Sequence, residues 1–248
     1  RKDHPRWGAR KLLGLLAQQQ PDWELPCESS VCNILRAEGL SRPRRRRRNV
    51  QPCPKPFAPT QAPNEVWSAD FKGQFYTKDG TCCYPLTVMD HVSRYLLCCQ
   101  IVNGTRTKES RKVFKVLFDR YGLPERIRTD NGAPFASIGV GGLSKLSVWW
   151  IRLGILPERI APGKPQQNGR HERMHKTLKA ATALPPKGNL SAQQRAFNHF
   201  RRTFNEVRPH QALGRGICPS DIHMTSTRPY PERLPEMAYP SGWLVRKV

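Results

Sequence analysis

The sequence has few acidic residues and no long apolar run. Among its 248 residues, 19 Asp and Glu stand against 42 Lys and Arg, which gives a formal net charge of +23 and a pI near 10.3. No stretch approaches the roughly 20 apolar residues that a membrane-crossing helix needs, so membrane-spanning proteins are excluded. A charge this far from zero repels itself in a compact state, and we therefore expect a polyanionic partner.

The chain also lacks an initiator Met and the apolar segment of a signal peptide, because it opens on Arg1-Lys2-Asp3. We therefore expect a fragment of a cytoplasmic protein. Its eight Cys form neither a disulfide framework nor a C-x-x-C zinc site, so reduced and mostly buried thiols are the simpler expectation. A hydrophobic content of 38% supports a packed core, whereas 23 Pro indicate a substantial linker.

Two short amphipathic helices are predicted at the start of the chain. One apolar stripe runs through residues 7–19, and a second helix is expected over 28–38. The second helix leaves Ser30, Asn33 and Arg36 on its outward face. Spacing alone favours an ordinary helical hairpin over a helix-turn-helix that enters a DNA groove.

A basic and Pro-rich segment follows these helices. It contains five consecutive arginines, Arg44, Arg45, Arg46, Arg47 and Arg48, and then a Pro-rich stretch over 51–63 without hydrophobic periodicity. This composition is typical of an extended linker. Each phosphate that such a run neutralises releases bound cations and adds salt-dependent affinity. We therefore predict that the run binds nucleic acid, with a solvated linker or a localisation signal as the alternatives.

From residue 64 onward the pattern changes to alternating strands and helices. Strands are predicted over 66–76, 82–89, 95–102, 127–129 and 155–160, and helices over 107–121, 143–153, 166–183 and 191–207. The first three strands are expected to be antiparallel, and Met174, Leu178 and Ala181 should form the apolar face of the third helix. This order predicts an α/β fold with a mixed sheet and flanking helices.

Three acidic residues occupy unusual places in this pattern. Asp70 falls in the middle of the first strand, Asp130 ends the fourth strand, and Glu172 lies on the helix after the fifth. Neighbouring carboxylates repel one another, and a divalent cation with oxygen ligands is the usual remedy. The three residues together predict a Mg²⁺ site, although each alone would pass as a turn or solvated residue.

Four segments resemble the DDE insertion-sequence transposases, whose integrase-like core shares a ribonuclease H-like fold with retroviral integrases. The segments are NEVWSADF at 64–71, RTDNG at 128–132, PQQNGRHER at 165–173 and NEVRPHQAL at 205–213. The resemblance spans nearly the whole chain, and it favours the helix-turn-helix interpretation of the first two helices. It implies metal-dependent DNA cleavage and strand transfer, with no covalent protein intermediate.

The resemblance also implies roles for individual residues. Asp70, Asp130 and Glu172 would be the catalytic acids that hold two Mg²⁺ ions, for which Mn²⁺ would substitute. Lys179 would contact donor DNA, and Lys176 and His175 should lie beside it on the face of Glu172. The expected partners are double-stranded DNA, as element ends and target, and further copies of the chain. The expected location is the bacterial cytoplasm, in association with the nucleoid and not with a membrane.

The expected organisation has four parts. A helix-turn-helix-like DNA-binding segment at 1–41 precedes the Arg/Pro-rich linker at 42–63, the ribonuclease H-like integrase core at 64–224 and the start of a truncated C-terminal β segment at 225–248. The spacing between Asp130 and Glu172 exceeds the commonest spacing in the resembled family. We place the extra residues in the Gly-rich segment 137–142, where they would lengthen a loop without moving helices.

Two other functions stay open at this point. His171-Glu172-Arg173-Met174-His175 matches the H-E-x-x-H pattern of zinc peptidases, but Leu178 and Ala181 stand where the extended metzincin pattern needs Gly and His. A non-catalytic DNA-binding protein, such as a decayed transposase, is the second alternative, although the intact acids argue against decay. His210 and Asp90 are expected to have structural roles.

Overall fold

The computed structural model describes residues 1–41, 57–138 and 140–235. In these residues the order is α1 (Ala9–Gln19), α2 (Glu28–Ala37), β1 (Val66–Phe71), β2 (Phe75–Tyr76), β3 (Cys82–Asp90), β4 (Leu96–Val102), α3 (Thr107–Tyr121), β5 (Arg126–Thr129), α4 (Lys145–Arg152), β6 (Leu156–Arg159), α5 (Gly169–Thr182), α6 (Leu190–Arg202) and α7 (Pro219–Ile222). A 3₁₀ turn covers Val140–Gly142, a second covers Pro165–Asn168, and a π-helical turn covers Thr203–Val207. The prediction for the arginines at 44–48 lies outside the described residues.

Six strands form one mixed sheet in the described part of the chain. β3 pairs antiparallel with β1, β2 and β4, whereas β5 pairs parallel with β1 and β6. The α/β prediction and the antiparallel order of the first strands are therefore confirmed. The single strand predicted over 66–76 is wrong, because the chain breaks between β1 and β2 at Gly73, whose φ of 81° is left-handed.

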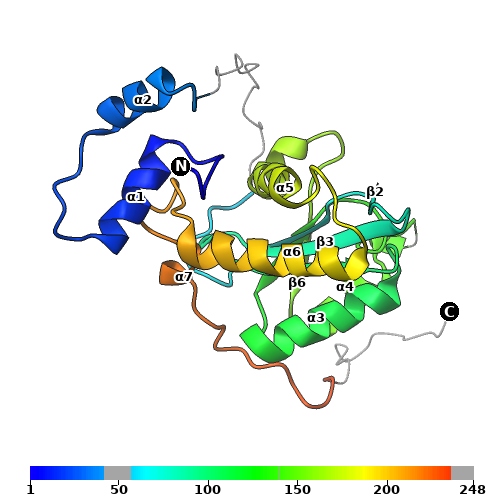
Figure 1. Ribbon diagram of the computed structural model, residues 1–248. Helices are drawn as coiled ribbons and strands as arrows, with labels where there is room; N and C mark the ends of the chain where they lie inside the picture. Colours follow the sequence, from blue (N-terminus) through cyan, green and yellow to red (C-terminus); the bar gives the residue numbers. More distant parts are fainter. Residues whose placement is uncertain (42–56, 139, 236–248) are drawn as a thin grey trace.

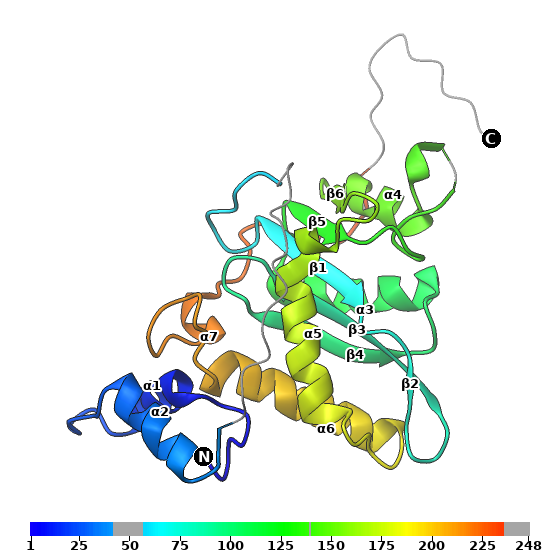
Figure 2. The ribbon, with the colours of Figure 1, turned by 90° about the horizontal axis from the view of Figure 1, so that it is seen from above.

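The sheet is covered on both faces. One core cluster joins the sheet to α3 and α4, and the other joins it to α5 and α6. Figures 1 and 2 show α5 crossing the sheet on the side opposite α3. Trp67 and Ala69 belong to the α3 side. Because successive strand residues point to opposite faces, Ser68 and Asp70 of β1 point towards α5.

The predicted helices are present, with local differences. α3 ends before Gly122, whose φ of 74° suits the predicted helix stop, and α4 begins after the capping residue Ser144. Met174 and Leu178 of α5 are buried as predicted, but Ala181 is exposed, because the buried face continues at i+4 spacing to Thr182 and not to Ala181. The helix predicted over 191–207 continues as a π-helical turn from Thr203.

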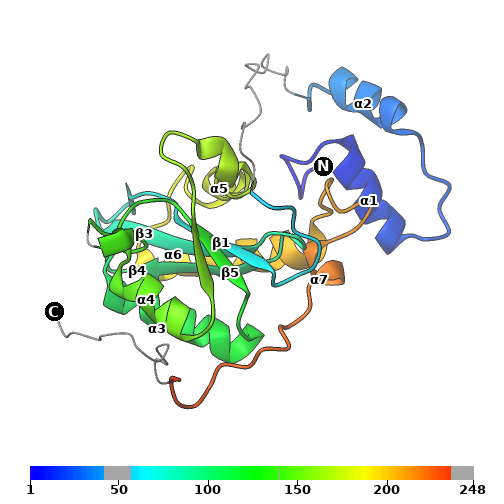
Figure 3. The same cartoon turned by 180° about the vertical axis from the view of Figure 1, so that it is seen from behind.

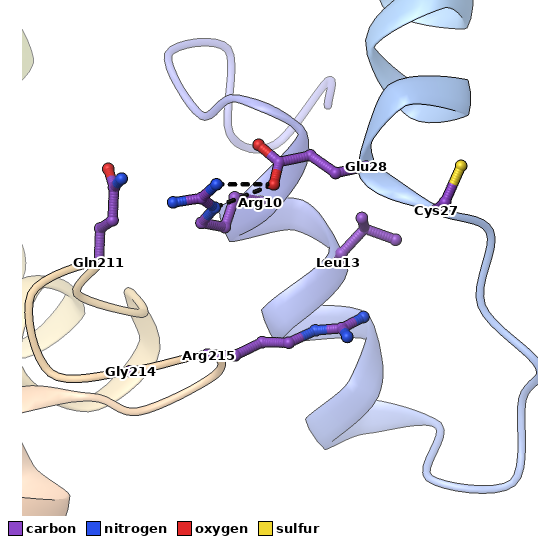
Figure 4. A pocket seen from close by; sticks show the side chains of 7 residues that line it. All are labelled: Arg10, Leu13, Cys27, Glu28, Gln211, Gly214 and Arg215. Atoms are coloured by element: carbon purple, nitrogen blue, oxygen red, sulfur yellow. Dashed lines mark hydrogen bonds and ion pairs between the residues drawn. The ribbon is translucent and has the colours of Figure 1, made fainter.

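The N-terminal helices lie at one end of the core, beside α7 (Figure 3). A Cβ atom on Gly14 of α1 would lie only 3.2 Å from the Gly216 Cα and the Pro209 Cγ, so the helix approaches this loop closely. Gln18 donates a hydrogen bond of 2.7 Å to the Gly216 carbonyl. Figure 4 shows the neighbouring cavity of about 380 Å³, where Arg10 of α1 forms an ion pair of 2.9 Å with Glu28 of α2.

The segment after α7 packs along the core. The Ser226 N–H donates to the Tyr121 carbonyl over 2.8 Å, and the Arg228 guanidinium donates to the carbonyls of Pro124 and Leu153. The described part of the predicted C-terminal β segment, 225–235, contains no strand, and its remainder lies outside the described residues. None of the described helices is both long enough and apolar enough to cross a membrane.

Asp90 and His210 organise turns, as predicted. The buried Asp90 carboxylate accepts hydrogen bonds from the backbone N–H groups of Asn64 and Ser93 and from the Ser93 hydroxyl, over 2.8, 2.7 and 2.6 Å. The Nδ1 atom of His210 accepts from the Ala212 N–H over 3.3 Å. Both residues therefore hold the backbone around them.

Candidate active site

Asp70 and Asp130 come from neighbouring parallel strands. β1 and β5 pair with Val66 opposite Arg126 and Ser68 opposite Arg128. Continuing this register by two residues brings Asp70 beside Asp130, which follows the last residue of β5. Parallel strands present their carboxyl ends at the same edge of a sheet, so the two carboxylates share that edge.

Glu172 reaches the same region from the first turn of α5. The helix is set against β1 and β3 by His171, whose Nδ1 lies 2.8 Å from the Ser68 hydroxyl and whose Nε2 lies 2.7 Å from the Thr87 hydroxyl. Glu172 is the next residue along the helix, and its side chain is exposed. The buried imidazole therefore fixes the turn that carries the third acid.

A hydroxyl group joins both histidines of α5 to the sheet. Thr87 Oγ1 donates to the Asp70 carbonyl over 3.0 Å, and the Nε2 atoms of His171 and His175 lie 2.7 and 2.6 Å from the same oxygen. Ser68 Oγ, 2.8 Å from His171 Nδ1, donates to the Met89 carbonyl over 3.2 Å, and His175 Nδ1 lies 3.8 Å from an Asp70 carboxylate oxygen.

The two histidines stay neutral in this environment. Burial lowers the pKa of both imidazoles far below the ordinary value, and His171 lowers the pKa of His175 further. This placement corrects one prediction, since His175 faces the sheet instead of sharing the exposed face of Glu172 and Lys176. The reason is that His175 lies four residues after the buried His171 and therefore shares the side of the helix that contacts Thr87.

The electrostatics around Asp70 indicate a concentration of negative charge. Burial raises the pKa of Asp70 to about 7, and the neighbouring carboxylates of Asp130 and Glu172 raise it too. The three acids therefore lie close enough to act on one another. Lys72 acts in the opposite direction and lowers the pKa of Asp70.

This donor set suits a hard divalent cation. Carboxylate oxygens are the preferred ligands of Mg²⁺, and a cation would relieve the mutual repulsion of the three acids. A second compact group consists of one oxygen of Asp70 and one ring nitrogen each of His171 and His175, which all lie within 4.8 Å of one another. The Nε2 atoms of both histidines are taken by Thr87, so this group offers fewer free donors.

The predicted DNA-binding residues fall into two separate places. Lys176 and Lys179 are exposed on α5. Burial lowers the pKa of Lys72, and the nearby charge of Lys179 lowers the pKa of Lys72 too. Ser30, Asn33 and Arg36 are exposed on α2, in the N-terminal helices and apart from the three acids. The structure thus brings the α5 lysines, but not the α2 residues, to the acidic edge.

The Gly-rich segment closes on itself. Ala136 and Leu143 form an isolated β-bridge, and the Ser137 N–H donates to the Gly142 carbonyl over 3.0 Å. The Arg159 guanidinium also donates to the carbonyls of Gly141 and Gly142. The extra residues therefore leave and rejoin the core at one point, which is the behaviour expected of an insertion between Asp130 and Glu172.

Several residues of this region were not predicted from the sequence. Ser68 and Thr87 are small hydroxyl residues inside strands, where such residues are common, and nothing in their spacing singles them out. Lys72 could have been found, because it stands two residues after Asp70 and period-two alternation puts both on one face. The i, i+4 spacing of His171 and His175 likewise indicated a shared helix face.

Comparisons with known proteins find similar sequences over most of the chain. A family profile described as integrase core domain matches residues 60–165, and a second profile of the same description matches residues 153–216. A protein of insertion element IS407 from Burkholderia multivorans is 28% identical over 219 residues, which cover 88% of this chain and 75% of that protein.

A further relative comes from insertion element IS476 of Xanthomonas euvesicatoria. It is 26% identical over 215 residues, covering 86% of this chain, and the chain spans 59% of its length. Among solved structures, the catalytic core domain of HTLV-2 integrase in complex with magnesium has a TM-score of 0.51 at 20% identity, covering 65% of this chain and 97% of that one. A chain in the structure of a simian T-cell lymphotropic virus intasome in complex with PP2A regulatory subunit B56 gamma has a TM-score of 0.57 at 18% identity, covering 99% of this chain and 80% of that one. These likenesses show the ribonuclease H-like fold.

Proposed function

Because this chain belongs to the insertion-sequence transposases with an integrase-like core, we propose that it cleaves and joins DNA strands with Asp70, Asp130 and Glu172 as its catalytic acids. In this proposal the three carboxylates bind two Mg²⁺ ions, with Mn²⁺ able to substitute. The substrates are the double-stranded ends of the element and a target duplex. Further copies of the chain assemble on these ends, in the bacterial cytoplasm.

The observation that carries the proposal is the register of β1 and β5. It puts two acids, 60 positions apart in the sequence numbering, at the same edge of the sheet. α5 adds Glu172 to that edge through the contacts of His171 with Ser68 and Thr87. Three elements thus converge on one acidic place, which is what a carboxylate-held metal centre requires.

The roles of the residues follow from this arrangement. Bound Mg²⁺ would activate a water or a 3′-hydroxyl and stabilise the leaving 3′-oxygen of an in-line displacement at a phosphodiester. Asp70 and Asp130 hold their oxygens on adjacent strands, so their separation is set by backbone pairing and not by a loop. Lys176 and Lys179 offer positive charge for DNA phosphates on the exposed face of α5. The helices at 1–41 and the arginines at 44–48 are proposed to supply further DNA affinity.

A zinc peptidase is not favoured. Such an enzyme needs the imidazole nitrogens of both His171 and His175 on one metal ion. Here the Nε2 atoms of both rings lie within hydrogen-bond distance of Thr87, and Nδ1 of His171 lies within that distance of Ser68. The imidazoles therefore serve as connections between α5 and the sheet.

The test compares strand cleavage and DNA binding in the same variants. Asp70→Asn, Asp130→Asn and Glu172→Gln should each abolish Mg²⁺-dependent cleavage of a labelled duplex carrying the element's own end, while binding in a chelator is retained. Asp119→Asn is a matched control, because Asp119 pairs with Lys115 on α3 at the other face of the sheet. It should cleave like the parent protein.

Three results would contradict the proposal. Cleavage by all three variants at the parental rate would exclude these acids as the catalytic set. One stoichiometric zinc in the purified protein, lost in His175→Ala together with peptide hydrolysis, would instead favour the peptidase. Binding of the element end without cleavage by the parent protein in Mg²⁺ or Mn²⁺ would identify a non-catalytic DNA-binding protein.

A further inference from the structure

A basic cleft adjoins Glu172 on the side of the N-terminal helices. Its volume is about 860 Å³, and its walls come from α1, the turn between β3 and β4, α5 and the segment after the π-helical turn. The Lys, Arg, Asp and Glu residues that line it are five cations and one carboxylate, namely Lys11, Arg94, Arg170, Arg173, Arg208 and Glu172. The wall therefore carries a large excess of positive charge.

The protein compensates these cations only in part, because the carboxylate of Asp90 acts on Arg94 and raises its pKa. Within the described ranges, none of the five forms an ion pair with a carboxylate. The guanidinium groups of Arg94 and Arg170 both donate to the neutral carbonyl of His91. Arg126 and Arg128, by contrast, both pair with Glu158 elsewhere on the core. The cleft thus keeps its positive charge, whereas these two arginines elsewhere on the core are paired with a carboxylate.

The crowding of these groups lowers the pKa of two of them. Burial and the charge of Arg208 lower the pKa of Lys11 to about 8, and burial followed by Arg170 lowers that of Arg94 to about 10. Lys11 comes from α1 and Arg208 follows the π-helical turn, so the docking of the N-terminal helices brings them together. Partly buried like charges are unfavourable unless an anion lies between them.

The size and the lining of the cleft favour a polyanion over a small metabolite. Small-molecule pockets usually have few charged groups among mainly apolar walls. Here the cations come from four separate elements and extend around one large space that reaches Glu172. A DNA strand repeats its negative charge about every 3.4 Å along the helix axis, and it can therefore engage several separated cations at once.

We propose that this cleft binds the phosphodiester backbone of the DNA strand leading to the scissile phosphate, with Lys11, Arg94, Arg173 and Arg208 as phosphate contacts. The inference rests on the proposed function, because Glu172 marks the reacting centre at the rim of the cleft. It adds a role for α1 that is independent of any reading of bases by α2. α1 closes one wall of the channel that guides the strand to the three acids.

The first experiment measures how DNA affinity depends on salt, using the full chain, a chelator and a fluorescent duplex of arbitrary sequence. The double variant Arg94→Gln/Arg208→Gln should lower the slope of log K against log salt by roughly 1.8, at about 0.9 per phosphate contact. Arg94→Lys/Arg208→Lys should keep most of the slope, because the charge is retained. Arg106→Gln/Lys108→Gln is the matched control, since both residues are exposed at the start of α3, which covers the other face of the sheet.

The outcomes separate this inference from the proposed function. A cleft variant that keeps its thermal midpoint and the parental slope would overturn the inference, as would an equal loss in the α3 control. In either case, normal cleavage by the parent protein would leave the proposed function standing. Failure of the parent protein to cleave the element end, with the cleft variant still lowering the salt slope, would instead contradict only the catalytic assignment.

A second measurement tests the cleft without changing a residue. Lys11 and Lys108 are acetylated with a limiting reagent at neutral pH, with and without saturating duplex, and quantified by mass spectrometry. DNA should protect Lys11 severalfold and leave Lys108 on α3 unchanged. Equal reactivity of Lys11 in the free protein and in the complex would show that the backbone does not enter the cleft.

Discussion

Thr87 and Asp70 lie directly opposite each other in the antiparallel pair of β3 and β1, and the Thr87 hydroxyl donates a hydrogen bond of 3.0 Å to the Asp70 carbonyl oxygen. The same hydroxyl oxygen contacts His171 and His175 of α5. One buried side chain therefore connects the strand that carries the first acid to the helix that carries the third. The relative position of Asp70 and Glu172 depends on this connection.

Replacing Thr87 by Val should test that dependence. Val has the same shape, but it removes the hydroxyl that both buried imidazoles contact and leaves their Nε2 atoms without this hydrogen-bond partner, which should lower the free energy of unfolding by about 1–3 kcal/mol. Cleavage should fall by more than the change in folded fraction explains, because α5 loses its register on the sheet. Denaturant unfolding and cleavage at a temperature where the variant is fully folded measure the two effects. Thr105→Val, at an exposed position before α3, should change neither.

Gly14→Leu should detach the N-terminal helices from the core. A glycine inside a helix costs roughly 1 kcal/mol relative to alanine, so its replacement would by itself strengthen α1. The close approach to Gly216 and Pro209 should outweigh this gain, because the new side chain has no space there. Hydrogen exchange in α1 should become faster, whereas exchange in the sheet should not change.

Ala17→Leu is the control for this prediction, because it adds similar bulk at an exposed position of the same helix. It should leave exchange in α1 slow. Protection of α1 in Gly14→Leu equal to that of the parent protein would show that Gly14 does not determine the docking.

His91 should make the protein sensitive to acid. Burial, followed by the charges of Arg170 and Arg128, lowers the pKa of this imidazole from its ordinary 6.5 to about 3. Below pH 6.5 the His91 imidazole therefore binds a proton in the unfolded chain but stays neutral in the folded protein. Stability should fall as the pH drops from 6.5 towards 3, by up to about 1.4 kcal/mol per pH unit for this group.

The measurement is urea unfolding at several pH values inside that window. His91→Asn should make the fall less steep, whatever its effect on the absolute stability. His199→Asn, on the exposed side of α6, serves as the comparison and should preserve the parental slope. Identical slopes in the parent protein and His91→Asn would refute the assignment.

The sequence by itself determined the class of the protein and most of its elements. The strand and helix periods in 64–207 predicted the order of strands and helices along the chain, because the buried faces of α3, α5 and α6 repeat with helical spacing. The sequence also predicted the positions of Asp70, Asp130 and Glu172 relative to these elements. Asp70 drew attention because an acidic residue in the middle of a strand is unusual. The excess of Lys and Arg predicted a polyanionic partner without locating its binding place.

Only the tertiary structure decided how these parts meet. The pairing of β1 with β5 brings Asp70 beside Asp130, and no local pattern contains that register. The histidines of the H-E-x-x-H pattern could have been metal ligands, and it is the hydroxyl of Thr87, far away in the sequence, that makes them buried connections. The basic cleft likewise exists because α1 docks on the loop at Gly216 and brings Lys11 near Arg208. Contacts between residues far apart in the chain depend on packing of complete elements, which short sequence patterns do not encode.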